Sequence, residues 1–352
     1  MSNSISNIDK NFAVPDSVKK DGVVFYNAES EPFKIYGVFK EDGLFRRMPL
    51  DVAQGVSENV GLLSMHTAGG RVRFVTDSAH IYISAKTPAV GKMPHFALTG
   101  SAGFDLYEKT EDGHRHRNSF VPPFNITDGF ENMVSLIDKK EREITINFPT
   151  YSRVSELYIG LDEGSSLLPA PEYTNKNKIV YYGSSITQGG CCSRPGNTYQ
   201  AIISRRFDCD YLNLGFSGSA LAEDEMIEYI KNLPMSVFVY DYDHNAPTYE
   251  HLLATHEKMF KEIREKNPTL PIIILPRPRY TLVTNDEVNR FKVIKKTYEN
   301  AIRSGDKNVY FLSGRELMAI AKDDGRVDTC HPNDLGFYSM AVALGDLLEK
   351  II

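Results

Sequence analysis

The pattern of hydrophobic and polar positions divides the chain into two parts. Up to about residue 172, apolar and polar residues alternate over short segments that Gly, Pro, Asn and Asp interrupt. Alternation with period two, rich in β-branched and aromatic residues, is typical of an antiparallel sandwich or jelly roll. The clearest predicted strands are residues 33–39, 71–75, 80–84, 143–147 and 155–160. The first part is therefore predicted to be an all-β domain.

The second part alternates apolar runs with longer segments of helical periodicity, which predicts a parallel sheet with helices on both faces. The predicted strands are residues 179–182, 211–214, 237–240, 272–275 and 309–312. The predicted helices are residues 198–207, 222–231, 248–266, 286–303 and 334–351. Residues 167–178 are rich in proline and polar residues, as a connection between domains would be. We therefore expect a β domain over residues 1–173 and a three-layer α/β/α domain over residues 174–352.

Composition and charge narrow the class of protein. The chain has 41% hydrophobic and 24% charged residues, with no apolar stretch long enough to cross a bilayer. A net charge of -6 and a pI near 5.9 argue against nucleic acid as a partner, because phosphate binding needs a concentrated basic surface. Residues 1–10 lack the apolar core of a secretory signal, which predicts a cytoplasmic protein. A secreted or periplasmic protein whose leader had been removed would look the same.

A serine nucleophile is suggested by residues 178–189, an apolar run that breaks at Gly183 into small hydroxyl residues. A serine at the carboxyl end of a parallel strand stands where ligands reach open α/β sheets. Ser185 is our predicted nucleophile, since a turn that can approach a substrate follows it. Ser184 is the competing candidate, and two serines after a glycine also occur at ordinary strand ends.

A general base for this serine is available near the C-terminus. A serine hydroxyl needs a base within hydrogen-bond reach and a carboxylate that orients the base. His331 and Asp328, three residues apart and just ahead of the last predicted helix, supply this pair. On its own this spacing is common. Cys330 lies between them and is interpreted as a small filler residue rather than a nucleophile.

Two further positions could stabilise an oxyanion. Gly218 follows the second predicted strand, where a glycine lets a backbone N–H point into the site. Asn245 follows the third strand, and its amide could be a second donor. A plain glycine turn at the first position and a polar loop or helix cap at the second are the structural alternatives.

In this order of Ser, Gly, Asn and Asp-x-x-His at successive strand ends, the chain resembles the SGNH hydrolase superfamily, also called GDSL esterases and lipases. Residues 183–187 (GSSIT), 213–218 (NLGFSG) and 328–336 (DTCHPNDLG) are similar to its first, second and last blocks. The resemblance covers roughly residues 174–352 and implies a flavodoxin-like domain.

The resemblance also implies the roles of individual residues. It makes Ser185 the nucleophile, His331 the base and Asp328 its partner, and it places the oxyanion between the Ser185 amide, Gly218 and Asn245. The third block departs from the family pattern, because it has Asp243 where a glycine is usual and no aspartate after the asparagine. In the first block Ser184 replaces the usual aspartate.

The β domain carries a motif of its own. Residues 101–107 (SAGFDLY) resemble the GxDLY motif of an N-terminal β domain found on some SGNH esterases. We expect a structural role for Asp105 in this motif rather than a catalytic one.

No metal or cofactor is implied by the sequence. No His, Cys or carboxylate cluster has the spacing of a zinc site, and neither a P-loop nor a GxGxxG is present. The absence of a GxSxG elbow argues against an α/β-hydrolase. Arg277 and Arg279 follow the fourth predicted strand, where a guanidinium could hold a polar or anionic part of a substrate. Simple surface exposure of both is the alternative.

Together these features predict a serine hydrolase of carboxylic esters. The similarity to SGNH enzymes with a β domain favours short acyl groups, chiefly acetate, on a small-molecule or oligosaccharide substrate. The chain has no tryptophan, a common sugar platform, but 19 tyrosines and 19 phenylalanines supply other aromatic surfaces. The alternatives are an acyltransferase with the same acyl-enzyme, a lipase or lysophospholipase-type esterase, and a noncatalytic carbohydrate-binding protein.

Overall fold

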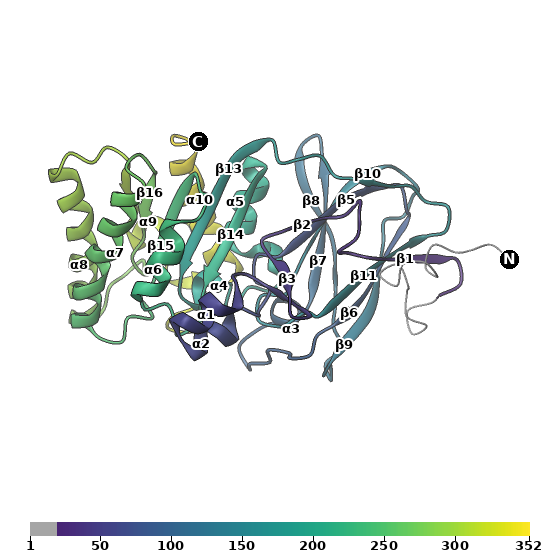
Figure 1. The fold of residues 1–352 in the computed structure, drawn as a ribbon, viewed down its shortest axis with the longest axis horizontal. Helices are drawn as coiled ribbons and strands as arrows, with labels where there is room; N and C mark the ends of the chain where they lie inside the picture. Colours follow the sequence, from purple (N-terminus) through teal and green to yellow (C-terminus); the bar gives the residue numbers. More distant parts are fainter. Residues whose placement is uncertain (1–19) are drawn as a thin grey trace.

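The computed structural model of the protein describes residues 20–352. A β-rich N-terminal part and an α/β C-terminal part lie side by side along the long axis of the molecule (Figure 1). Residues 1–10, on which the expected location depended, lie outside the described residues. Among the helices of residues 20–352, none combines the length and the apolar character that a membrane crossing requires.

The N-terminal part is a sandwich of two sheets. The first sheet has the strand order β1 (Val23–Asn27), β11 (Glu156–Asp162), β6 (His80–Lys86), β9 (Gly129–Ser135). The second has the order β12 (Leu167–Pro169), β5 (Arg71–Thr76), β10 (Arg142–Asn147), β7 (Phe104–Thr110), β8 (Gly113–Phe120), with β2 (Lys34–Tyr36) also paired to β5. A separate hairpin joins β3 (Phe39–Glu41) to β4 (Leu44–Arg46). All these pairings are antiparallel, as the period-two pattern predicts.

Alternate residues of the facing strands form the core of the sandwich. Phe74 and Ile144 of one sheet pack in the same buried cluster as Ile83 and Ile159 of the other. Because side chains along a strand alternate between its two faces, this inward set leaves the intervening residues on the outer faces.

The C-terminal part is built on a five-stranded parallel sheet. Its order is β14 (Cys209–Gly215), β13 (Asn175–Gly183), β15 (Val237–Asp241), β16 (Ile272–Ile274), β17 (Val309–Phe311). In order of appearance along the chain this is 2-1-3-4-5, the flavodoxin-like order. Sequence alternation along β13 sends Val180 and Tyr182 to one buried cluster and Ile179 and Tyr181 to the other, so both faces of the sheet are covered.

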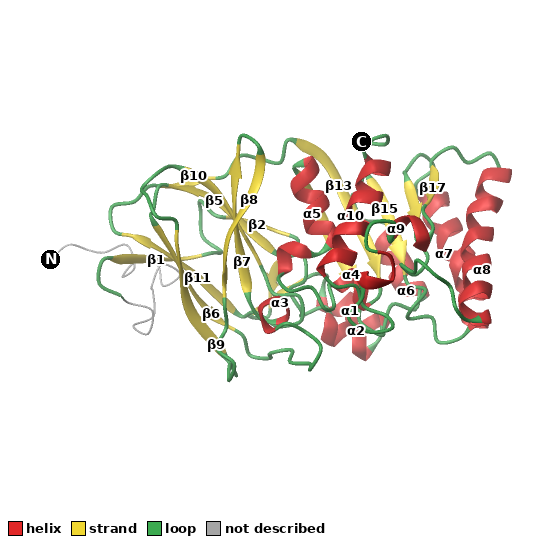
Figure 2. Cartoon of the chain, turned by 180° about the vertical axis from the view of Figure 1, so that it is seen from behind, coloured by secondary structure: helices red, strands yellow, loops and turns green. Residues whose placement is uncertain are grey.

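Helices form a layer on each face of this sheet. Apolar residues of α6 (Asp224–Lys231), α7 (Tyr249–Lys266) and α8 (Asn285–Arg303) join the first cluster. Those of α4 (Ser185–Gln188), α5 (Tyr199–Phe207), α9 (Gly314–Leu317) and α10 (Asp334–Leu348) join the second. Figures 1 and 2 view the molecule from opposite sides and show these two layers in turn. The predicted fold class, a β sandwich followed by a three-layer α/β/α domain, is confirmed.

Two short helices of the N-terminal part are a feature that the sequence pattern did not predict. α1 (Leu50–Val56) and α2 (Glu58–Leu63) lie beneath the parallel sheet in Figure 1 rather than on the sandwich. Ala53 and Val60, both 0% exposed, and Met48 just before α1 belong to the same buried cluster as Tyr182 and Leu214 of the sheet. A segment from the first half of the chain therefore completes one layer of the second domain. The boundary near residue 173 stays a prediction.

The GxDLY-like motif lies at the contact between the two parts. Asp105, on β7, is fully buried and accepts hydrogen bonds from the Gly196 amide at 2.8 Å and from Asn147 Nδ2 at 2.8 Å. Arg194 Nη1 lies 3.3 Å from the same carboxylate. Because Gly196 and Arg194 belong to the α/β part, the contacts of Asp105 match the structural role that we expect for it.

Replacing Asp105 by alanine should destabilise the protein. The change leaves the Gly196 amide and Asn147 Nδ2 buried without an acceptor, and each unsatisfied donor costs about 1–3 kcal/mol. The midpoint of thermal unfolding should fall by several degrees, as followed by circular dichroism. Asp112, exposed in the turn between β7 and β8, gives the matched control D112A. Equal midpoints for the two variants would contradict a docking role.

Candidate active site

The two candidate serines have different surroundings. β13 ends at Gly183, and α4 begins at Ser185 at the lower end of that strand (Figure 1). The hydroxyl of Ser184 caps α4 by accepting a hydrogen bond from the Ile186 amide at 3.2 Å. Ser185 Oγ instead lies 2.9 Å from Nε2 of His331. The geometry thus pairs Ser185, and not Ser184, with the histidine.

Asp328 and His331 are held together in the loop ahead of α10. Asp328 Oδ2 lies 2.8 Å from Nδ1 of His331, and Oδ1 accepts the amides of Cys330 at 2.6 Å and His331 at 2.7 Å. Burial opposes ionisation of Asp328, but these hydrogen bonds outweigh it and lower its pKa to about 2. The carboxylate is therefore ionised at neutral pH and accepts a hydrogen bond from the Nδ1–H of His331. Nε2 of the same ring is left to face Ser185.

Gly218 lies in a tight turn directly after β14. The Ser219 amide donates to the Phe216 carbonyl at 2.9 Å, and Gly218 has a φ of 69° at the third position of this turn. A positive φ at that position defines a type II turn and favours glycine. A turn of this kind holds the backbone at the end of the strand in one conformation.

Asn245 contacts the same turn. It follows β15, and its Nδ2 donates to the Phe216 carbonyl at 2.7 Å. A carboxamide nitrogen carries two hydrogens, so one donor of Asn245 is used here and the second is left for another acceptor. The structure thus brings Asn245 next to the Gly218 turn, although the block around it departs from the family pattern.

Gln188, at the end of α4, ties this turn to the β sandwich. Its Oε1 accepts the Ser217 amide at 3.0 Å, and its Nε2 lies 3.1 Å from Nδ1 of His66 and 3.2 Å from the Thr150 carbonyl. Burial, reinforced by nearby arginines, lowers the pKa of His66 to about 3, so this imidazole is neutral and can accept a hydrogen bond. The sequence alone did not point to these residues, because each is an isolated polar position.

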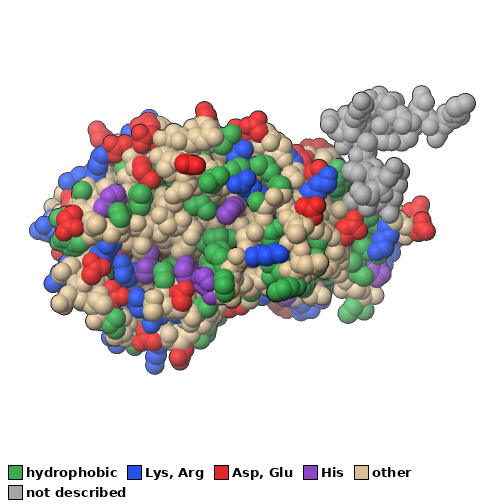
Figure 3. Space-filling model, turned by 90° about the horizontal axis from the view of Figure 1, so that it is seen from below, with side chains coloured by type: hydrophobic (Ala, Val, Ile, Leu, Met, Phe, Trp, Pro, Cys, Tyr) green, Lys and Arg blue, Asp and Glu red, His purple; other side chains and the backbone are tan. Residues whose placement is uncertain are grey.

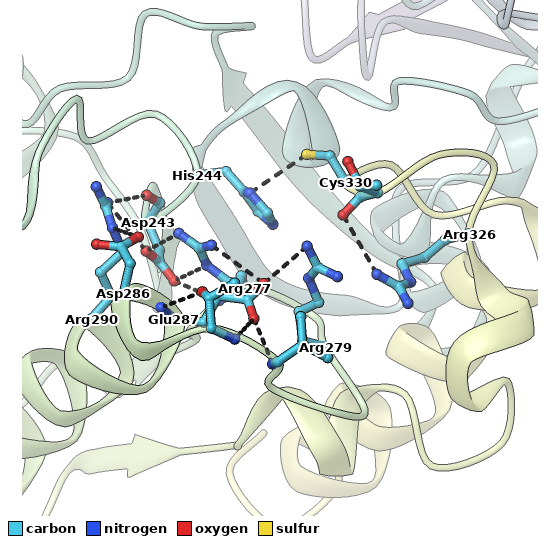
Figure 4. A network of polar contacts seen from close by, with 12 residues as sticks. Asp243, His244, Arg277, Arg279, Asp286, Glu287, Arg290, Arg326 and Cys330 are labelled. Atoms are coloured by element: carbon cyan, nitrogen blue, oxygen red, sulfur yellow. Dashed lines mark hydrogen bonds and ion pairs between the residues drawn. The ribbon is translucent and has the colours of Figure 1, made fainter.

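Arg277 and Arg279 lie after β16, as predicted, but carboxylates of the chain already hold them (Figure 4). Nε and Nη2 of Arg277 contact the two carboxylate oxygens of Asp243, each at 2.9 Å. Nη2 of Arg279 lies 2.9 Å from Glu287. Asp243 is the residue that replaces the family glycine, so the paired Arg277 accounts for the carboxylate buried there. A role of either arginine in substrate binding remains a prediction.

His244 and Cys330 form a further contact beside this network (Figure 4). Cys330 Sγ lies 3.5 Å from Nδ1 of His244. Burial lowers the pKa of His244 to about 3 and raises that of Cys330 to about 11, so the pair is a neutral imidazole and a thiol. A protonated thiol is a weak nucleophile, in keeping with the filler role expected for Cys330.

The β domain contacts His331 through the loop before α3 (Leu98–Ser101). The rings of His95 and Phe96 lie 5.8 and 5.9 Å from the His331 ring, centroid to centroid. Figure 3 views the molecule from this lower side, where histidine side chains reach the surface close together among hydrophobic ones. Residues 87–97 show no strand or helix periodicity, so this contact could not be predicted from the pattern along the chain.

The arrangement has a definite chemical capacity. A hydroxyl paired with an imidazole, which is paired in turn with an ionised carboxylate, is the arrangement that activates serine as a nucleophile. Ser185 is 7% exposed and the His331 side chain 18%, so the hydroxyl lies just below the surface.

Two family models match the chain. Residues 176–351, half of the chain, match the model of the GDSL-like lipase/acylhydrolase family. Residues 23–167 match the GxDLY model, described as the N-terminus of SGNH-hydrolase-type esterases. A comparison with curated proteins gave no match.

Solved structures of the same architecture include three that align over most of the chain. A candidate GDSL-like lipase from Bacteroides ovatus ATCC 8483 is 26% identical, with a TM-score of 0.84 over 94% of this chain and 98% of its own. The salicylyl-acyltransferase SsfX3 from a tetracycline biosynthetic pathway is 19% identical, with a TM-score of 0.73 over 95% and 99%. A family two carbohydrate esterase from Cellvibrio japonicus is 12% identical, with a TM-score of 0.61 over 94% and 98%.

Proposed function

The chain belongs to the GDSL-like lipase/acylhydrolase family, and from this premise we propose that it hydrolyses carboxylic esters through an acyl-enzyme on Ser185. The observation that carries the proposal is the chain of hydrogen-bond distances from Ser185 Oγ to His331 Nε2, at 2.9 Å, and from His331 Nδ1 to Asp328, at 2.8 Å. These distances are within the range at which a base takes a proton from a nucleophile.

In the proposed first half-reaction, Ser185 Oγ attacks the ester carbonyl while its proton passes to Nε2 of His331. Asp328 stabilises the imidazolium through the Nδ1 hydrogen bond. Collapse of the tetrahedral intermediate breaks the bond to the alkoxy oxygen, which leaves as an alcohol with the proton from Nε2. In the second half-reaction, water gives a proton to Nε2 and its oxygen attacks the acyl carbon. The second intermediate collapses by breaking the bond from that carbon to Ser185 Oγ, which takes the proton back from Nε2, and the free acid leaves.

The oxyanion of each intermediate needs preorganised donors. We assign this role to the amides of Ser185 and Gly218 and to Nδ2 of Asn245. Two observations support the assignment. The positive φ of Gly218 fixes the conformation of the turn, and the hydrogen bond from Asn245 to the Phe216 carbonyl holds the Asn245 side chain against the same turn. Arg277, held by Asp243, is proposed to keep the loop before Asn245 in place.

The proposed substrate is a short acyl ester, chiefly acetate, on a carbohydrate. Two features support it: the similarity in fold to a family two carbohydrate esterase, and the close packing around Ser185, which is 7% exposed with Phe96 packed against His331. The first favours a carbohydrate ester, and the second favours a small acyl group over a long chain.

The substrate class can be tested with two sets of esters. We expect acetate release from acetylated xylo-oligosaccharides, and kcat/KM for p-nitrophenyl acetate above that for long-chain p-nitrophenyl esters. Acid release measured by titration, with S185A as the blank, separates enzymatic from spontaneous hydrolysis. A preference for long chains would instead favour a lipase or lysophospholipase-type esterase.

An acyltransferase is the second candidate, because the fold is also similar to that of a salicylyl-acyltransferase. The two activities share the acyl-enzyme and differ in whether water or an alcohol resolves it. Adding an acceptor alcohol to the esterase assay distinguishes them: a transferase forms the new ester as its main product, whereas a hydrolase continues to release the free acid.

A further inference from the structure

Four side chains with metal-binding atoms meet at the proposed triad, and two of them belong to it. They are His95 from the β domain, Cys191 from the turn after α4, and Asp328 and His331 from the loop before α10, and one donor atom of each lies within 4.8 Å of the others. These residues are far apart in the sequence, except for the last two. Residue spacing alone predicts no metal site. Spacing along the chain does not show that these four residues meet in the fold.

Asp328 links the two imidazoles of this group. Asp328 Oδ2 lies 2.8 Å from Nδ1 of His331 and 3.9 Å from Nε2 of His95. Cys191 is 7% exposed, and its thiol lies within 4.8 Å of the other three donors. Nε2 of His331 faces the other way, toward Ser185.

From this convergence we propose that His95, Cys191, Asp328 and His331 form a binding site for a zinc ion, which switches the proposed esterase off. Two imidazoles, a thiolate and a carboxylate are all ligands that zinc takes, and four of them suit its tetrahedral preference. A thiolate and a carboxylate together balance the charge of Zn²⁺, so the filled site is neutral.

The distances are close to those that the ion requires. With metal bonds of about 2.0–2.3 Å, tetrahedral donors lie about 3.3–3.8 Å apart. The present donor atoms need shifts of about 1 Å to reach that geometry. The side chain of His95 is 40% exposed on a loop and that of Asp328 is 36% exposed, so both have room to adjust.

Zinc at this place would remove the general base. An ion on Nδ1 of His331 replaces the proton that Asp328 now accepts, and the neutral imidazole must then carry its proton on Nε2. That nitrogen can no longer take a proton from Ser185. The Cys191 thiol releases its proton to solvent as the thiolate binds, while the proton of His331 only moves from Nδ1 to Nε2, so one proton is released for each zinc ion.

The site can be tested on the whole protein with Co²⁺ as a spectroscopic probe and Zn²⁺ as the inhibitor. We expect Co²⁺ to give a thiolate-to-cobalt charge-transfer band, and Zn²⁺ to displace it. Zn²⁺ should also inhibit hydrolysis of p-nitrophenyl acetate, and EDTA should restore it. The variants C191S and H95Q should each bind zinc at least about tenfold more weakly, since even outer-shell changes cost that much.

Cys330 supplies the matched control, because it neighbours His331 but is not one of the four donors. C330S should keep the cobalt band and the zinc affinity of the wild type. The proposal is overturned if the cobalt band is absent, or if C191S binds zinc as tightly as the wild type. The inhibition arm rests on the proposed function, but the cobalt spectrum does not. A protein with the band and without esterase activity would retain the metal site and refute the esterase.

Discussion

Replacing Ser185 by alanine is expected to reduce ester turnover on the order of 10⁶-fold, while the protein remains folded. The hydroxyl is the atom that Nε2 of His331 faces at 2.9 Å, and no other described contact of that nitrogen offers a nucleophile. The side chain makes no cap, so its loss removes little from the fold. Hydrolysis of p-nitrophenyl acetate measures the loss of turnover. Labelling by a fluorophosphonate probe measures the loss of the reactive nucleophile.

Ser184 provides the control for this result. Its hydroxyl caps α4, so S184A should cost about 1 kcal/mol of stability and still be labelled by the probe. A variant S185A that keeps more than about one per cent of wild-type turnover, or takes up the probe, would refute the assignment of the nucleophile.

The second large effect is expected for Asp328→Asn, which should lower kcat about 10³- to 10⁴-fold. Oδ1 of Asp328 accepts hydrogen bonds from two backbone amides. In the asparagine variant, the single side-chain oxygen will occupy this position, because only an oxygen can accept these bonds. The new amide nitrogen must then face Nδ1 of His331, where it can only donate. This forces the proton of the imidazole to Nε2 and removes the base without moving the ring.

Asp334 offers a carboxylate of similar position for comparison. It lies in the first turn of α10 and accepts the Ser193 amide at 2.9 Å, with no contact to His331. D334N should therefore retain most of its kcat. If D328N and D334N lose activity equally, the loop before α10 and not the tautomer of His331 determines the rate, and the assigned role of Asp328 is incorrect.

The sequence predicted the parallel sheet well because its central strands β15 and β16 are buried on both faces and read as continuous apolar runs. The five predicted strands each overlap one observed strand, and the helices between them start and end within a few residues of their predicted bounds. The strands of the sandwich were more difficult to predict. The predicted strand at residues 33–39 is interrupted at Gly37, whose φ of 74° separates β2 from β3. Such a break depends on a backbone conformation that alternation does not encode.

Some residues of the candidate site could also be predicted from the sequence, and others could not. Ser185, Asp328 and His331 follow strands or precede a helix, so their positions could be predicted from the order of elements. The partners of Arg277 and the approach of His95 could not, because both depend on contacts between segments far apart in the chain. In the sequence, Asp243 was noted only as a departure from the family glycine. The structure shows that its carboxylate pairs with the guanidinium of Arg277.

The placement of α1 and α2 determines where this chain can be divided. Arg47, just before α1, donates to the carbonyls of Asn213 and Gly215 at 3.0 and 2.6 Å, at the end of the strand that leads into the Gly218 turn. An α/β half transplanted without residues 47–63 would lose these hydrogen bonds. It would also expose the apolar face of the sheet that Ala53 and Val60 cover. The halves are thus not interchangeable modules. An exchange of the α/β half for that of a related protein should therefore include residues 47–63, because a cut at residue 173 alone would separate them from the sheet that they cover.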